Sequence, residues 1–337
     1  MTEILLTTFF ISVLLFFLGS GIWVALSMIG VSSIGMILFT SRPVGDAMAT
    51  TIWGASSSWT LTALPLFVWM GEILFRTKLS ENLFKGLAPW LQKLPGGLIH
   101  VNVVGCALFA AISGSSAATV ATVGKMSIPE LRKRKYPEKI LLGSLAGSGT
   151  LGLLIPPSII LIIYGVTVQE SIAKLFIAGI IPGIMIALIF MSYVIVWSLI
   201  NKKSMPRLIE NSSFLEKVKK SRQLMPVVLL ILGVIGSIYT GVATATEAAS
   251  LGVVGALILS YFQKSLNLKT FKASLLGATK TSCMIAFILA GATFLSLAMG
   301  FTGLPRNLAI WIQGMDLSPY VLIFVLMIFY IILGMFL

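Results

Sequence analysis

The chain has 337 residues, of which 57% are hydrophobic and only 10% are charged, with a mean hydropathy of +1.02. A soluble domain carries about 25% charged residues, so this composition excludes a soluble enzyme with a large core. The net charge is +13, and 21 of the 24 Lys and Arg residues lie in four stretches: 76–93, 125–139, 202–222 and 264–280. This clustering is typical of the cytoplasmic loops of a polytopic all-α membrane protein and argues against a nucleic-acid partner.

The first apolar segments are long enough to form membrane helices. We predict helices over 4–18, 21–40 and 50–75. Glu72 and Arg76 lie one turn apart near the end of the third and predict an exposed ion pair. Residues 76–95 are amphipathic and basic, and they predict an arm at the cytoplasmic surface.

The segment 98–124 has basic stretches on both sides, so a single crossing would place one of them outside the cytoplasm. A reversal at Ser113-Gly114-Ser115-Ser116 keeps both flanks on the cytoplasmic side. Each limb then has about 10 to 15 residues, which is the length of a re-entrant segment. The sequence therefore predicts a helical hairpin that enters from the cytoplasm.

The next segment, 140–168, is interrupted twice, by Gly147-Ser148-Gly149-Thr150 and by Pro156-Pro157-Ser158. Pro156 and Pro157 remove two successive N–H donors, which prevents a regular helix there. We expect a broken helix that crosses outward and a helix over 172–200 that crosses back. Residues 201–224 are predicted to form a cytoplasmic linker.

The second half repeats the order of the first. Helices are predicted over 225–240, 243–262 and 276–303, followed by an amphipathic stretch from 304 to 316 and an apolar segment over 318–337. The first predicted helices of the two halves start at 4 and 225, and the two predicted hairpins start at 98 and 319. Both pairs have the same separation in the sequence. Residues 1–200 and 225–337 are therefore predicted to be inverted repeats. At this offset the chain stops within the second hairpin, so the sequence is expected to be C-terminally incomplete.

One carboxylate of the second half has two interpretations. Thr244 and Glu247 fit a capping box at a helix start, in which the Glu247 side chain bonds back to the backbone. The alternative is that Glu247 is a buried functional carboxylate. Cys106, Cys283 and His100 have no metal-ligand spacing, and the two cysteines are expected to be small packing residues.

The two interruptions predict a cation site, because unwound backbone carbonyls and hydroxyls are oxygen ligands. No carboxylate lies in either break, which favours neutral ligands and weak binding of Na⁺. The predicted Na⁺ ligands are Ser113, Gly114, Ser115, Ser116, Gly147, Ser148, Gly149 and Thr150. The alternative is that the small residues only allow close helix packing. No cofactor other than Na⁺ as coupling ion is expected.

These motifs also carry a family resemblance. Residues 111–124 read AISGSSAATVATVG and residues 147–158 read GSGTLGLLIPPS. Together with Thr246-Glu247-Ala248-Ala249 and the closing 333–337, they resemble the large membrane subunit of tripartite ATP-independent periplasmic (TRAP) transporters. The resemblance implies an elevator-type ion transporter fold and Na⁺-driven import of an organic acid, such as a C4-dicarboxylate or a sialic acid, across the bacterial inner membrane.

The resemblance further implies two protein partners, a small four-helix membrane subunit and a periplasmic substrate-binding protein. It places one side of the substrate pocket at Ser116, Thr119, Pro156, Pro157 and Ser158. Two alternatives remain: a stand-alone sodium:anion symporter of a related fold, and an inactive truncated fragment. A membrane enzyme is disfavoured, because one His and no intramembrane acidic pair leave no catalytic cluster.

Overall fold

The computed structural model describes residues 2–76, 79–206, 213–222 and 224–336, and all regular secondary structure among them is helical. This confirms the all-α prediction. The chain divides into two compact units, one formed by Met1–Ser56 with Ala286–Leu337 and the other by Ser57–Ile285. Each unit is described by itself.

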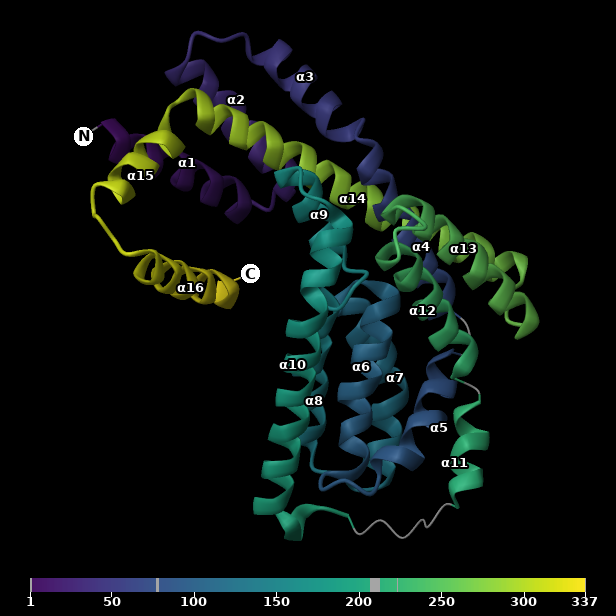
Figure 1. Cartoon of the computed structure of the whole chain (residues 1–337). Coiled ribbons are helices and arrows are strands. Elements are labelled where there is room, and N and C mark those ends of the chain that lie inside the picture. Colours follow the sequence, from purple (N-terminus) through teal and green to yellow (C-terminus); the bar gives the residue numbers. More distant parts are fainter. Residues whose placement is uncertain (1, 77–78, 207–212, 223, 337) are drawn as a thin grey trace. The chain divides into compact units, whose positions relative to one another are not determined.

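The helices follow one another along the chain as labelled in Figure 1. Their bounds are α1 (Thr2–Gly19), α2 (Val24–Phe39), α3 (Val44–Ser56), η1 (Trp59–Thr62), α4 (Ala63–Phe75), α5 (Leu79–Leu91), η2 (Gly97–Ile99), α6 (His100–Ser113), α7 (Ser116–Lys133), α8 (Glu138–Gly149), η3 (Thr150–Leu153), α9 (Ile159–Val168), α10 (Ile172–Ile200), η4 (Lys202–Ser204), α11 (Phe214–Ser221), α12 (Met225–Tyr239), α13 (Ala245–Phe262), α14 (Leu268–Phe301), α15 (Leu304–Gln313) and α16 (Pro319–Phe336).

Three of the described helices, α10, α13 and α14, are long and apolar enough to cross a membrane. The number rises to five if the pairs α3 with η1–α4 and α11 with α12 each form one broken span. Shorter apolar helices, α6 and α9 among them, accompany these spans. The chain is therefore a multi-pass membrane protein, while entry of the α6–α7 pair from the cytoplasm stays a prediction.

The predicted single helix over 50–75 is wrong. The structure has α3, which begins at Val44 and ends at Ser56, and then η1 and α4. The interruption falls on three consecutive serines, Ser56 to Ser58. Serine hydroxyls compete for backbone hydrogen bonds, which weakens a helix interior and favours breaks and caps.

The predicted helix over 276–303 begins too late, since α14 begins at Leu268. The side-chain oxygen of Asn267 accepts the N–H of Thr270 at 2.7 Å, which stabilises a helix start ahead of the basic stretch. Lys269, Lys272 and Lys280 therefore lie on a helix. Cys283 on the same helix is exposed, so its predicted packing role is wrong, whereas Cys106 is buried.

The element order of residues 225–336 follows that of the first half. Helices α2 and α13 begin at Val24 and Ala245, which is the same offset as that of the predicted repeat, and an amphipathic helix precedes α6 and α16 in each half. The continuous α14 takes the place of α3, η1 and α4. Inversion of the two repeats stays a prediction.

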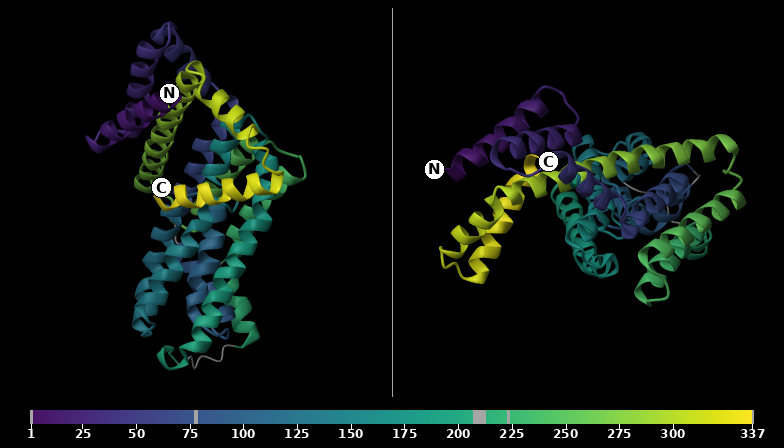
Figure 2. Two further views of the ribbon diagram at one scale, coloured as in Figure 1. Left: turned by 90° about the vertical axis from the view of Figure 1, so that its left-hand side faces the viewer. Right: turned by 90° about the horizontal axis from the view of Figure 1, so that it is seen from above.

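The unit formed by Ser57–Ile285 has one main apolar core, to which α4, α6, α9, α10, α12 and α13 contribute. Its blue and teal helices run side by side in Figures 1 and 2, and α6, α7 and α8 pack against one another. In the other unit, Met36, Phe294 and Ala298 form a small buried cluster. The backbone of Ala25 lies so close to Gly291 that a Cβ there would be 2.8 Å from its carbonyl oxygen.

A second apolar cluster lies where α6 begins and α7 ends, and it includes Leu98, Leu131 and Tyr136. Tyr136 is also hydrogen-bonded to the main chain of this cluster. The Leu98 N–H donates to the Tyr136 hydroxyl at 3.1 Å, and Tyr136 is 5% exposed. Burial raises the pKa of this phenol, so the folded chain favours its neutral form. The contribution of the neutral Tyr136 phenol to the stability of the folded chain is therefore complete below the unfolded-state pKa of about 10. It is lost as the pH rises through the folded-state pKa.

We expect Tyr136→Phe to destabilise the chain by about 1–3 kcal/mol near pH 8, because the Leu98 N–H loses its acceptor. Above about pH 10 the difference from wild type should shrink, as the wild type loses the neutral phenol. Thermal unfolding of both chains from pH 8 to 11 measures this difference. Tyr164→Phe, at a 54% exposed position, is the control and should change stability little. A Tyr136→Phe difference that stays constant over this range contradicts the account.

Candidate functional site

The hairpin tip consists of two residues between α6 and α7. Gly114 adopts a left-handed conformation (φ +58°) and donates its N–H to the Ala110 carbonyl at 3.0 Å, which ends α6. Ser115 then caps α7, since its Oγ accepts the N–H of Ala118 at 3.4 Å. The polar motif of the sequence is thus where one helix ends and the next begins.

The side chains at the tip form a small hydroxyl network. Ser113 Oγ lies 3.0 Å from Thr119 Oγ1, and Thr119 Oγ1 donates to the Ser115 carbonyl at 2.7 Å. Ser113 and Thr119 are both buried. Ser116 Oγ is also buried but has no hydrogen-bond partner among the described residues. An unpaired buried hydroxyl is costly, so the Ser116 side chain is a candidate oxygen ligand at the tip.

The second interruption separates α8 from α9. Because Pro156 and Pro157 lack N–H groups, the carbonyls of Gly152 and Leu153 have no helical donor four residues later. The Leu153 carbonyl instead accepts Ser158 Oγ at 2.6 Å. Ser158 also caps α9 by accepting the N–H of Leu161 at 3.4 Å. This leaves the Gly152 carbonyl as an oxygen that the helix does not use.

The hairpin tip and the Pro-Pro break meet. The Ile159 N–H donates to the Gly114 carbonyl at 3.2 Å, so α9 begins on the tip. A Cβ on Gly114 would lie 2.7 Å from the Pro157 carbonyl oxygen. A Cβ on Gly152 would lie 2.8 Å from both Ser115 C and Ser116 N. We call this contact between residues 113–119 and 152–159 the junction.

The junction contains only part of the residue set predicted from the sequence. It holds Ser113, Gly114, Ser115, Ser116, Thr119, Pro157 and Ser158. Pro156 lies within the range 152–159 but packs against α10 and not against the hairpin tip, with its Cγ 3.8 Å from a Cβ placed on Gly179.

The first break, 147–150, is used for packing and local bonds. Gly147 faces the Phe190 ring of α10, and a Cβ on Gly149 would overlap the Val120 side chain of α7. Ser148 Oγ donates to the Ser144 carbonyl at 2.5 Å. Thr150 is exposed, and its hydroxyl donates to the Gly147 carbonyl at 2.7 Å.

Sequence reasoning misses two residues of this region. Gly152 brings the break against the tip, and its signal is a glycine four residues before a proline. Asn102 is fully buried, and its Nδ2 donates to the Leu141 carbonyl at 3.2 Å and to Ser144 Oγ at 3.0 Å. Asn102 ties α6 to α8, and a lone Asn in an apolar segment is its signal.

The chemistry of the junction suits a monovalent cation. From 98 to 129 and from 139 to 169 the sequence has no Asp or Glu, so the available ligands are hydroxyls and carbonyls. In the part of the chain that the structure describes, no three His, Cys, Asp or Glu residues gather as metal ligands. Neutral oxygens fit a weakly bound hard cation and do not fit a transition metal. The Ser116 hydroxyl and the Gly152 carbonyl are two of these oxygens.

Both helices that start at the junction, α7 and α9, direct their N-termini toward it. A helix N-terminus carries partial positive charge, which favours an anion. The N–H groups of Ala118, Ile159 and Leu161 at these two ends are bonded within the protein. The junction therefore brings hydroxyl and carbonyl oxygens together with two helix N-termini.

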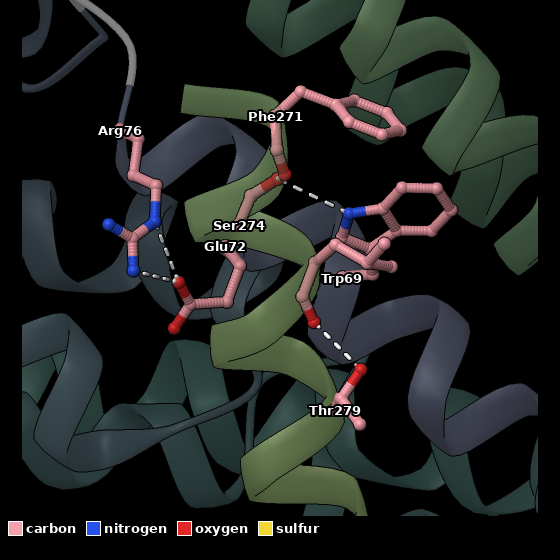
Figure 3. A network of polar contacts seen from close by, with 7 residues as sticks. Trp69, Glu72, Arg76, Phe271, Ser274 and Thr279 are labelled. Carbon is pink, nitrogen blue, oxygen red and sulfur yellow. Dashed lines mark hydrogen bonds and ion pairs between the residues drawn. The ribbon is translucent and has the colours of Figure 1, made fainter. Parts of the chain in front are cut away.

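Outside the junction, polar contacts join α4 to α14 (Figure 3). Arg76 donates to Glu72 Oε2 from Nε at 3.1 Å and from Nη2 at 3.0 Å, which confirms the predicted ion pair. Trp69 Nε1 donates to Ser274 Oγ at 3.3 Å, and its ring packs edge-on against Phe271. The capping box of Thr244 and Glu247 is also confirmed. These carboxylates have structural roles, so the alternative of a functional Glu247 is not needed.

The fold and the junction define a class: a multi-pass helical membrane protein in which two interrupted helical segments meet at a site of neutral oxygens. Comparison with known families then identifies the chain. Residues 10–337 match the family described as tripartite ATP-independent periplasmic transporter, DctM component, and the chain belongs to this family. The resemblance inferred from the motifs is thereby confirmed.

Curated relatives are large permease proteins of TRAP transporters. The chain is 32% identical to the C4-dicarboxylate protein DctM of Pseudomonas aeruginosa, over 91% of this chain and 72% of the relative. It is 32% identical to the sialic acid protein SiaM of Vibrio cholerae (94% and 74%) and 30% identical to the 2,3-diketo-L-gulonate protein YiaN of Escherichia coli (86% and 67%). Membership makes the chain a transporter component, and it implies a small membrane subunit and a periplasmic binding protein as partners.

Proposed function

We propose that this chain is the large transmembrane subunit of a TRAP transporter that imports an organic acid together with Na⁺. The observation that carries the proposal is the junction, where unused oxygens and two helix N-termini lie together. Relatives named for a C4-dicarboxylate, a sialic acid and a diketo-gulonate support a carboxylate as the substrate. The protein would lie in the bacterial inner membrane, with a small four-helix subunit beside it and a periplasmic binding protein delivering the substrate.

The mechanism follows from the order in which the junction can be filled. Na⁺ bound by Ser116 Oγ and the Gly152 carbonyl would fix the tip against the break. This would fix the N-termini of α7 and α9 in place for the substrate carboxylate, so the anion binds the sodium-loaded state better than the empty one. Such a coupling is reciprocal, so substrate would also tighten Na⁺ binding.

The transport step would move the hairpin and the broken helix together. α6, α7, α8 and α9 are joined by direct bonds, among them Ile159 to Gly114 and Asn102 to Ser144, so they can move as one body. In this elevator-type mechanism the remaining helices and the amphipathic arms form the fixed frame. The second half of the chain would contribute the related elements of the inverted repeat.

Proteoliposomes test the proposal. They would contain this chain with its small subunit, and purified binding protein would be added outside with labelled succinate or N-acetylneuraminate. We expect uptake with an inward Na⁺ gradient and at least tenfold less with K⁺ or choline in its place. Equal uptake without Na⁺ overturns the coupling. Equal uptake without the binding protein would favour the stand-alone symporter instead.

A further inference from the structure

The linker between α10 and α12 contains a short helix, α11, that packs on the amphipathic helix α5 (Figure 1). Trp90 Nε1 donates to Ser221 Oγ at 2.6 Å, and Ser221 Oγ donates to the Gly86 carbonyl at 3.3 Å. The Trp90 ring also meets the Phe214 ring edge-on, with centroids 6.0 Å apart, and Lys217 Nζ lies 5.6 Å from its centre. One face of α11 is therefore held by α5.

An adjoining face of α11 is apolar and largely exposed, with Phe214 at the edge that also meets Trp90. Phe214, Leu215 and Val218 are 70%, 79% and 47% exposed. Positions i, i+1 and i+4 share one side of a helix, so the three side chains form one strip. Large apolar side chains gathered in this way on a short polar linker indicate a contact with another apolar phase.

The rest of α11 and the residue after it are basic. Lys219, Lys220 and Arg222 are exposed, and Glu216 is the only acidic residue between 213 and 222. The helix begins shortly after the membrane span α10, which ends at Ile200. A helix near a span in the sequence, with an apolar strip flanked by Lys and Arg, has the composition of one that lies in the bilayer interface and attracts anionic lipid.

We propose that α11 binds the anionic phospholipid surface on the cytoplasmic side of the membrane. Phe214, Leu215 and Val218 enter the headgroup region, and Lys219, Lys220 and Arg222 contact lipid phosphates. Because Trp90 and Ser221 join α11 to α5, lipid bound at α11 also fixes the α5 arm at the surface. The proposal does not depend on Na⁺ coupling or on the identity of the substrate.

The test places an environment-sensitive fluorophore (NBD) at Leu215→Cys, in a Cys283→Ser background; Cys106 is buried and stays. The full chain is reconstituted in nanodiscs of phosphatidylcholine alone or of phosphatidylcholine mixed with phosphatidylglycerol, each with lipids that carry a nitroxide near the headgroup. We expect blue-shifted emission and at least twofold stronger quenching in the anionic discs. The variant K219Q/K220Q/R222Q should return quenching to the level of the neutral discs.

The matched control removes three other exposed basic residues, Lys133, Lys135 and Lys139, by the same change to Gln. We expect this control to leave the quenching of the label unchanged. An equal loss in the control overturns a specific role of α11. Weak quenching in both lipid mixtures also overturns the proposal, because the strip would then face water or another protein. The comparison of the two lipid mixtures uses the labelled chain without any charge substitution. It therefore tests the proposal even if K219Q/K220Q/R222Q does not fold.

Discussion

Gly152→Ala is expected to lower Na⁺-driven uptake by at least tenfold. Its Cβ would lie 2.8 Å from the Ser115 carbonyl carbon and the Ser116 nitrogen, both backbone atoms that no rotamer change can move. The break must then shift away from the hairpin tip, which separates Gly152 from the backbone of Ser115 and Ser116. Misplacement of site groups by about 1 Å is enough for a loss of this size. Uptake in proteoliposomes, normalised to the amount of folded protein, measures the effect.

Gly143→Ala provides a matched control on α8. A Cβ at Gly143 meets no atom within 4 Å, and alanine favours a helix interior over glycine. This variant should transport like wild type and unfold at the same or a slightly higher temperature. Normal uptake by Gly152→Ala would show that the tip and the break do not need to meet, and would contradict the proposed site.

Ser116→Ala is expected to raise the Na⁺ concentration for half-maximal uptake about fivefold to tenfold. The substitution removes one oxygen ligand and leaves the volume of the site nearly unchanged. A factor of this size corresponds to about 1.0–1.4 kcal/mol, within the range of a single hydrogen-bonding group. Uptake measured over a series of Na⁺ concentrations, at fixed substrate, gives the value.

Thr150→Val is the informative comparison, because Thr150 belongs to the ligand set predicted from the sequence. Its side chain is exposed and bonded to the Gly147 carbonyl, so the structure predicts less than a twofold change. A Thr150→Val effect equal to that of Ser116→Ala would place the cation at the first break. The assignment of the Na⁺ site to the junction would then be wrong.

Much of the helical framework can be predicted from local features of the sequence. Helix α10 has the predicted bounds, 172–200, because a long apolar run follows Ser171, whose side chain accepts the N–H of Lys174. The capping box of α13 and the Glu72–Arg76 pair are likewise short-range patterns. The predicted helix bounds are wrong where polar residues interrupt or precede a helix. Ser56 to Ser58 break the predicted helix over 50–75, and α14 begins earlier than predicted, ahead of a basic stretch.

The composition of the site can be predicted, but its arrangement cannot. The hydroxyls and prolines are visible in the sequence as interruptions of apolar segments. Which of them share a site depends on the packing of Gly152 against Ser115 and Ser116, a contact between two distant parts of the sequence that no periodicity encodes. The same holds for Asn102, whose partners Leu141 and Ser144 lie on another helix.

The central claim is that the junction of the hairpin tip and the Pro-Pro break binds Na⁺. Thermal unfolding of the purified chain in 100 mM NaCl and in 100 mM KCl tests it directly. A ligand present at ten to one hundred times its Kd stabilises the folded state by about 1.4–2.7 kcal/mol, which for a chain of this size predicts a rise in Tm of a few degrees in Na⁺. The stabilisation by Na⁺ should be about 1 kcal/mol smaller in Ser116→Ala, absent in Gly152→Ala and kept in Gly143→Ala. Equal Tm values in the two salts, or a sodium-dependent rise of wild-type size in both Ser116→Ala and Gly152→Ala, would contradict the claim.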